Sequence, residues 1–286
     1  MRLAVIGCLL STAAAAFANP VTNADPDPGD PAVIAIVNSA GDIGCTASVI
    51  APHTGITAAH CVVGRDPTTL RVFFGNAVGG DGLYIPISDA RAHPGFDPGG
   101  RDIAVFTLRV RAPVTPLVLA GPLDGSLVGT SIRAVGFGFT AGAAADAGIK
   151  REGTARISSV QPEELVAVPG PSLSCLGDSG GPALLPAGTI AGVVSRVDAM
   201  CVDHAVYTRV DIAQDVLIQP YLAETAPGAA GEGEPCFYDD HCATGLECAG
   251  DVKRVCESAG CGCASGSPGS LVILVAGFVL GRRRRH

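Results

Sequence analysis

The sequence predicts an all-β protein, and three observations lead to that prediction. Short, continuous apolar runs recur through the central part of the chain, and runs of this length are typical of buried strands. Clusters rich in Gly, Pro and Asp separate the runs, as turns between strands do. Helical patterns do not intervene between them, which favours a β-barrel or a β-sandwich. The pattern alone does not choose between these two architectures.

Each of the apolar runs is expected to form one strand. The runs cover residues 32–37, 47–50, 70–74, 103–108, 132–135, 190–195 and 205–210. The next segment differs from them, because Ile212, Val216 and Leu217 share one face at helical spacing. Asp211 stands where it can cap such a helix, so we expect a packing helix over residues 211–218.

The composition limits the classes of function. The chain has 286 residues and a formal charge of −8, which allows one large domain with appendages. This negative charge gives no support to nucleic-acid binding, which needs a basic surface, and we expect neither a cofactor nor a metal. The chain also contains eleven cysteines, which in an exported protein indicate an oxidising compartment.

Residues 1–18 are predicted to be a secretory signal peptide. Arg2 supplies the positive start, Leu3–Leu10 is apolar, and the triplet ending at Ala18 has the small-x-small pattern of a cleavage site. A lipoprotein cleavage before Cys8 is the alternative, but the apolar run ahead of it is too short for that reading. The chain is therefore expected to leave the cytoplasm.

A serine motif lies in the second half of the chain. Residues 174–182 have the sequence SCLGDSGGP, which places the Ser179 hydroxyl among glycines that allow a tight turn. Such a turn can aim the amides of Gly177 and Ser179 at one point, where they would stabilise a negative oxygen. A serine nucleophile also needs a base. His60 in TAAHC is the first candidate for that base, and Asp102 in RDIAVF is its candidate partner.

The motifs LGDSGGP, TAAHC and DIAVF, in the order His, Asp, Ser, resemble those of the trypsin/chymotrypsin-like serine proteases. The resemblance covers residues 21–222 and implies two six-stranded antiparallel β-barrels with the active site between them. It implies that His60 is the general base, that Asp102 orients it, and that Ser179 attacks the peptide carbonyl. Gly177 and Ser179 would form the oxyanion hole. The implied substrates are proteins or peptides.

The resemblance also implies two disulfides and an activation mechanism. One disulfide joins Cys45 to Cys61 beside the histidine, and the other joins Cys175 to Cys201 beside the serine. In the family, a cut frees the amino group of the residue corresponding to Val21. That group then pairs with the acid before the serine, which is Asp178 here, since a buried charge needs a partner.

The substrate pocket departs from the trypsin pattern. Leu173 stands where trypsin-like members carry an aspartate, and Val197 and Ala205 stand where open pockets have glycine. We therefore expect a shallow apolar pocket and a preference for small apolar P1 residues, as in elastase-like members. Arg196 replaces the family's tryptophan in the substrate-binding strand and is expected to favour an acidic neighbour.

The proposed protease domain, residues 19–224, is followed by a predicted linker over 225–234 and a small cysteine-rich module over 235–257. Four cysteines with spacing C-x5-C-x5-C-x7-C suggest two disulfides in a segment too short to build a core. Three connectivities are possible. A zinc site is the alternative, which neither the spacing nor an exported context favours. The module's cysteines are Cys236, Cys242, Cys248 and Cys256.

The C-terminal tail, residues 258–286, combines Cys261-Gly262-Cys263, an apolar run over 271–280 and the arginines 282–285. This order resembles the MYXO-CTERM sorting tail of myxobacteria and relatives, which implies export and sorting machinery as partners and delivery to the cell surface. The run would span about 15 Å as a helix, short of the roughly 30 Å hydrocarbon core. A short permanent membrane anchor is the alternative.

Three classes of function are consistent with these motifs. The first is an exported serine endopeptidase at the cell surface or outside the cell. The second is a catalytically silent surface binding protein that kept a protease fold, and the third is an esterase that uses the same triad. The complete set of His60, Asp102 and Ser179 with its oxyanion glycine favours the first.

Overall fold

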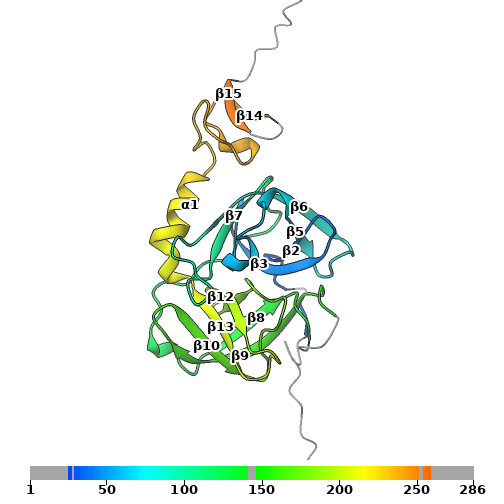
Figure 1. Ribbon diagram of the computed structural model, residues 1–286, viewed down its shortest axis with the longest axis vertical. Helices are drawn as coiled ribbons and strands as arrows, with labels where there is room; N and C mark the ends of the chain where they lie inside the picture. The colour runs from blue at the N-terminus through cyan, green and yellow to red at the C-terminus, as the bar shows by residue number, and fades with distance from the viewer. Residues whose placement is uncertain (1–24, 28, 141–145, 251–253, 259–286) are drawn as a thin grey trace, which may run out of the picture.

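The computed structural model describes residues 25–27, 29–140, 146–250 and 254–258. Two β-barrels lie one against the other, with a helix along their side and a small module beyond that helix (Figure 1). Both barrels are antiparallel and closed by six strands. The predicted all-β fold class is therefore confirmed. Of the two architectures that the strand pattern allowed, the structure has barrels and not a sandwich.

The first barrel contains the strands in the order β2-β3-β4-β7-β6-β5. Their bounds are β2 (Val33–Val37), β3 (Ile43–Ala51), β4 (Thr54–Thr57), β5 (Arg71–Gly75), β6 (Gly82–Ala92) and β7 (Ala104–Leu108). Strands β4 and β7 are hydrogen-bonded neighbours, so the chain segments that follow β4 and precede β7 meet at one end of the barrel.

The second barrel contains the strands in the order β9-β10-β13-β12-β11-β8 and closes through the pairing of β8 with β9. Their bounds are β8 (Ser131–Gly136), β9 (Arg151–Val160), β10 (Glu164–Pro169), β11 (Pro182–Leu184), β12 (Ile190–Val197) and β13 (Ala205–Arg209). A short strand β1 (Asp25–Pro26) pairs with β9 and attaches the start of the described chain to this barrel.

All seven predicted strands are present, but five strands of the barrels escaped the sequence prediction. The missed strands are β4, β6, β9, β10 and β11. Strand β9 is half-exposed along most of its length, so polar residues interrupt its apolar pattern. Strand β4 is fully buried but has the sequence TGIT, in which two threonines replace the expected aliphatic residues and the Thr57 hydroxyl is hydrogen-bonded.

The three largest apolar clusters of the described residues lie within the barrels and between them. One fills the first barrel and includes Ile34 and Phe106, and another fills the second barrel and includes Tyr207. The third joins the two barrels to the C-terminal helix and includes Val193 and Leu217. Because the barrels share this third cluster, their facing surfaces are fixed relative to each other, and with them any site that lies between them.

The predicted C-terminal helix is longer and less regular than expected. Its first turn, Asp211–Ala213, is a 3₁₀-helix and Gln214–Ile218 is a π-helix, while only α1 (Gln219–Glu224) is α-helical. A π-turn rotates side chains away from the 3.6-residue spacing. Val216 is consequently 53% exposed although Leu217 is buried, so the predicted shared face was wrong at Val216.

The predicted capping role of Asp211 was also wrong. The residue that precedes the helix is Val210, and no side chain caps its first turn. The Asp211 carboxylate instead accepts hydrogen bonds from the Leu123 amide at 2.9 Å and from the Arg209 guanidinium at 2.7 Å. Asp211 therefore ties the helix start to a loop of the second barrel.

The cysteine-rich module contains a hairpin of β14 (Leu246–Ala249) and β15 (Val255–Ser258). Its disulfides join Cys236 to Cys248 and Cys242 to Cys256, which selects one of the three connectivities and uses the sulfurs that zinc would need. The segment predicted as a linker hydrogen-bonds the module, for example from the Ala230 amide to the His241 carbonyl at 3.0 Å.

Several sequence predictions lie outside the described residues. These are the signal peptide, the freed amino group of Val21 and the sorting tail beyond residue 258. Among the helices that the structure describes, none is both long enough and apolar enough to cross a membrane.

Candidate active site

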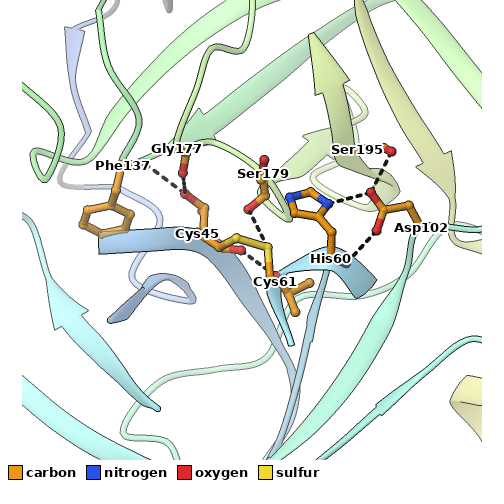
Figure 2. The surroundings of a disulfide bond; sticks show 10 residues. Cys45, His60, Cys61, Asp102, Phe137, Gly177, Ser179 and Ser195 are labelled. Atoms are coloured by element: carbon orange, nitrogen blue, oxygen red, sulfur yellow. Dashed lines mark hydrogen bonds and ion pairs between the residues drawn. A yellow bond between two sulfur atoms is a disulfide. The ribbon is translucent and has the colours of Figure 1, made fainter. Parts of the chain in front are cut away.

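His60 and Asp102 are brought together by neighbouring strands of the first barrel. His60 lies in the 3₁₀ turn Ala59–Cys61 just after β4, and Asp102 lies just before β7. One carboxylate oxygen of Asp102 accepts the backbone amide of His60 at 2.9 Å, and the other lies 2.7 Å from Nδ1 of its ring (Figure 2). This double contact fixes the ring's orientation and leaves Nε2 facing away from the carboxylate.

Ser195 also contacts this pair, a role that no sequence motif predicted. Its hydroxyl comes from β12 of the second barrel and donates to Asp102 Oδ2 at 2.8 Å. Burial alone would raise the pKa of Asp102, but the hydrogen bonds from His60 and Ser195 lower it below its ordinary value. The carboxylate is therefore kept ionised although only 5% of the residue is exposed.

Ser179 lies in the loop between β10 and β11, against the first barrel. Its carbonyl oxygen accepts the Thr46 amide at 2.8 Å and lies 3.8 Å from Cys61 Sγ, so it packs beside the turn that carries His60 (Figure 2). Within the described ranges, no hydrogen bond joins the Ser179 hydroxyl to the His60 ring. Such contacts are often long in the absence of substrate and tighten when it binds.

Gly180 explains why this loop approaches the first barrel so closely. Its φ is +81°, a conformation that costs residues with a side chain. A Cβ at this position would overlap Thr57 Oγ1 and lie 2.8 Å from the Ala58 amide nitrogen. Glycine is therefore required here by both backbone conformation and space, as the GDSGG motif predicts.

The amides of Gly177 and Ser179 are the predicted oxyanion-hole donors. In the part of the chain that the structure describes, neither N–H donates to a protein acceptor. The carbonyl of Leu176 accepts the Phe139 amide at 2.8 Å, and because a trans peptide opposes C=O and N–H, the Gly177 N–H points the other way. Two neighbouring free amides are the arrangement that can stabilise an oxyanion.

Two disulfides brace this region. Cys45–Cys61 connects β3 to the turn of His60, and Cys175–Cys201 connects the serine loop to the segment after β12. The structure forms both pairs that the family resemblance implied. The loops that carry His60 and Ser179 are therefore each held by one covalent link.

Asp178 directly precedes Ser179 in the serine loop, and its side chain is buried. Its two oxygens accept the amides of Gly138 and Cys175, each at 2.8 Å. Burial raises its pKa to about 6, although these amides and the charge of Arg151 lower it. Within the described ranges, no lysine or arginine forms an ion pair with this carboxyl group, and its predicted partner Val21 lies outside them.

The predicted pocket residues lie on the second barrel. Leu173 and Ala205 are fully buried in its apolar cluster, and Val197 packs at the edge of that cluster. Beside them, the buried Ser174 hydroxyl bonds the Tyr207 hydroxyl at 2.9 Å, a contact the sequence analysis did not anticipate. The predicted pocket base is thus apolar apart from one internally satisfied hydroxyl pair.

Arg196, which was expected to favour an acidic neighbour in the substrate, is paired with an acidic residue of this chain. Its guanidinium forms two parallel hydrogen bonds with the carboxylate of Glu164, at 2.6 and 2.8 Å. Because this pair neutralises the arginine, Arg196 does not offer a free positive charge to a substrate.

Three clusters of potential metal ligands occur in the described residues. Two of them contain cysteines that are joined in disulfides. The third consists of Asp27, Asp30 and Glu152, and Arg133 forms ion pairs with Asp30, at 2.7 Å, and with Glu152. The Lys150 ammonium donates to the Asp30 carbonyl at 2.7 Å. Cationic side chains of the protein therefore already offset part of the charge of this acidic cluster.

Comparisons with known proteins show which family and fold this chain is similar to. A family model described as Trypsin matches residues 21–217. A curated protein named "Trypsin" from Saccharopolyspora erythraea is 28% identical over 209 residues, which cover 66% of this chain and 92% of that protein. Among solved structures, a mutant of human heparin binding protein has a TM-score of 0.61 at 20% identity, over 68% of this chain and 93% of that chain.

Proposed function

This chain belongs to the trypsin family, and from that premise we propose that it is a serine endopeptidase whose catalytic residues are Ser179, His60 and Asp102. Its fold is that of the trypsin-like serine proteases, and proteins or peptides are the substrate class. The observation that carries the proposal is the double contact between Asp102 and His60, with the Ser179 loop packed beside it.

In the proposed reaction, the Ser179 oxygen attacks the scissile carbonyl while Nε2 of His60 takes its proton. Asp102 holds the ring in the required tautomer and stabilises the imidazolium. The amides of Gly177 and Ser179 stabilise the oxyanion. His60 then protonates the leaving amine, and water releases the acyl group by the same steps in reverse.

Hydrolysis of casein by the purified protein tests this proposal. The wild-type protein is expected to cleave casein, and Ser179→Ala is expected to remove that activity while leaving the unfolding midpoint unchanged. Casein that stays intact with the processed wild-type protein would overturn the endopeptidase assignment. Cleavage of small esters without casein would favour the esterase alternative, and no turnover of either would favour the binding-protein alternative.

We further propose a preference for small apolar P1 residues. The buried Leu173 and Ala205 support it, because a cationic P1 side chain would find no carboxylate at the pocket base. One methylene in an apolar pocket is worth only about 1–3 kcal/mol, so the preference is expected to be graded. A peptide library measures it directly, and faster cleavage after Arg or Lys than after Ala or Val would contradict it.

We propose that activation requires a cut after Pro20, which frees the amino group of Val21 to pair with Asp178. The buried, raised-pKa carboxyl of Asp178 supports this, because an ammonium partner would offset the cost of its charge. N-terminal sequencing of active and inactive fractions is the test. Full activity in protein that begins at Asn19 would contradict the proposal.

A disulfide-rich fold of this family is consistent with an exported protein. We propose that residues 1–18 direct export, and that the tail over 258–286 engages the sorting machinery and brings the enzyme to the cell surface. The order of cysteine motif, apolar run and arginines supports this. Cell fractionation with and without the tail tests it, and unchanged surface display without the tail would overturn it.

A further inference from the structure

Thr46 lies at the contact between the two barrels, directly after Cys45 on β3. It has no exposed surface, and all its polar groups are hydrogen-bonded, two of them to the serine loop. Its amide donates to the Ser179 carbonyl at 2.8 Å, and its carbonyl accepts the Thr57 hydroxyl at 2.8 Å. Its hydroxyl contacts the Gly177 carbonyl and the Phe137 amide, each at 3.1 Å.

The chemistry of the two partners fixes which atom donates in each hydrogen bond of the Thr46 hydroxyl. The Phe137 N–H can only donate, so it occupies a lone pair of the Thr46 oxygen. The Gly177 carbonyl can only accept, so it takes the hydroxyl proton. Figure 2 shows Gly177 and Phe137 facing the strand that carries Cys45. The hydroxyl therefore joins two segments of the second barrel from a strand of the first.

Gly177 needs such a restraint. Its φ is +92°, and a glycine backbone rotates more freely than that of any other residue. The peptide before it is held where the Phe139 amide donates to the Leu176 carbonyl at 2.8 Å. The peptide after it is held through its carbonyl by the Thr46 hydroxyl. With both flanking peptides fixed, the Gly177 N–H has a single direction.

We infer that Thr46 is a positioning residue for the oxyanion hole, which it holds in place from the opposite barrel through its hydroxyl. The inference rests on the proposed function, because it assigns to Gly177 the role of an oxyanion donor. Thr46 does not contact the reacting atoms. It acts through the Gly177 carbonyl, which fixes the peptide between Gly177 and Asp178 and with it the direction of the Gly177 N–H relative to the Ser179 N–H, so its loss is expected to weaken the transition state more than substrate binding.

The test compares Thr46→Val, which keeps the shape and removes the hydroxyl, with Thr46→Ser, which keeps the hydroxyl. Removing an oxyanion donor costs about 10²–10³ in kcat, so misorienting one is expected to lower kcat about 10–100-fold in Thr46→Val. KM is expected to change less than about threefold, because substrate and transition state share the remaining contacts. Thr46→Ser is expected to stay within about threefold of wild type.

Ser48 provides a matched control on the same strand and the same face. It is also fully buried, but its hydroxyl has no hydrogen-bond partner in the described part of the chain. Ser48→Ala is expected to leave kcat and KM unchanged. If Thr46→Val does not fold, Thr46→Ala removes the same hydroxyl with less bulk and takes its place.

A second readout separates this inference from the proposed function. In a Ser179→Ala background, which needs no catalysis, NMR spectra report the amide signals of Gly177 and Phe137. Loss of the Thr46 hydroxyl is expected to shift the Gly177 signal and to speed hydrogen exchange at Phe137. Unchanged signals, or an unchanged kcat in Thr46→Val, would overturn the positioning role. A wild-type protein that cleaves no substrate would overturn the proposed function, while the NMR result still decides the role of Thr46.

Discussion

The two barrels contribute to the candidate site in different ways. The first barrel holds its pair, His60 and Asp102, mainly by contacts within itself, at 2.9 and 2.7 Å, and the second barrel adds one hydrogen bond from Ser195. The second barrel contributes Ser179 on a glycine-rich loop whose nearest anchors include Thr46 of the other barrel. The acid–base pair is thus built mainly within one barrel, whereas the serine loop is held both by its own barrel and by contacts with the other.

This difference predicts where substitutions act. A change in the acid–base pair removes chemistry and leaves the packing between the barrels intact. A change at the contact of the serine loop with the first barrel disturbs both stability and catalysis, because the same hydrogen bonds serve both. Further substitutions, taken from the largest expected effect to the smallest, test this distinction and then the docking of the cysteine-rich module.

Asp102→Asn is expected to lower kcat about 10⁴-fold, because the amide favours the wrong tautomer of His60. The unfolding free energy is expected to change by less than the activation free energy does, since asparagine keeps the packing of the side chain. Steady-state kinetics and urea unfolding measure the two effects. Asp97→Asn is the control, because Asp97 is an exposed loop residue. Asp102→Asn activity within tenfold of wild type would contradict the role of the pair.

Gly180→Ala and Gly188→Ala separate strain from cross-barrel contact. Both glycines have positive φ, at +81° and +78°, so each alanine is expected to cost about 1–2 kcal/mol of conformational energy. Around Gly188 a Cβ meets nothing within 4 Å, whereas around Gly180 it overlaps the first barrel. Crowding adds about 1–3 kcal/mol, so Gly180→Ala is expected to lose more stability and also activity.

Urea unfolding and kcat measure this pair of variants. Gly188→Ala is expected to retain wild-type kcat. Equal losses of stability and activity in the two variants would show that a Cβ between the serine loop and the first barrel costs no more than a Cβ in open space. That result would contradict the claim that the serine loop depends on its contact with the first barrel.

Ser195→Ala removes the donor that reaches Asp102 from the second barrel. A hydrogen bond to a charged group contributes about 1.5–3 kcal/mol, so stability near pH 7 is expected to fall by that order. Because the folded pKa of Asp102 is lowered, this contribution is complete above the carboxyl's unperturbed pKa of about 3.9. It is lost as the pH falls through the lowered folded pKa. A pH series of urea unfolding tests this, and a pH-independent difference would contradict it.

The smallest expected effect is a pH dependence in the docking of the cysteine-rich module onto the first barrel. The His53 ring of the first barrel stacks on Tyr238 of the module at 3.7 Å, and the Tyr238 hydroxyl donates to the Thr225 carbonyl at 2.6 Å. Burial lowers the pKa of His53, and it is faced by Asp240, Arg111 and His241. Neutral His53 therefore stabilises the docked module, and this stabilisation is complete above the unperturbed histidine pKa of about 6.5. It is lost as the pH falls through the lowered pKa of His53 in the docked state.

Hydrogen exchange at the Ala230 amide, which bonds the module, measures this docking. Exchange is expected to speed up below about pH 6.5 in the wild-type protein beyond the intrinsic change of the amide. His53→Phe keeps an aromatic stack without a titratable group, so it is expected to remove the extra pH dependence. Equal pH dependence in both proteins would contradict the role of His53.

The same division explains what the sequence could predict. The neighbours of His60, Asp102 and Ser179 form contiguous motifs, because a tight turn or a buried strand needs particular residues in succession. Ser195 and Thr46 have no such signal, since the partners they contact are 93 and 131 residues away in the chain. A single buried hydroxyl gives no sequence pattern that points to a partner on the other barrel.

The fold shows the same limit. Strands such as β7, whose five residues are all buried, form apolar runs that the sequence predicts. The half-exposed β9 and the threonine-containing β4 have no such runs, and only the family resemblance implied that the barrels close. Likewise, the π-turn before α1 depends on packing against both barrels, so helical spacing misplaced Val216.

The central claim is that Ser179 is a nucleophile activated by His60. A fluorophosphonate probe tests it most directly, because the probe bonds an activated serine and its position can be found by peptide mass spectrometry. We predict a single label, on Ser179, that is absent in Ser179→Ala and forms far more slowly in His60→Ala. A label on another residue, or an equal rate of labelling in His60→Ala, would contradict the claim.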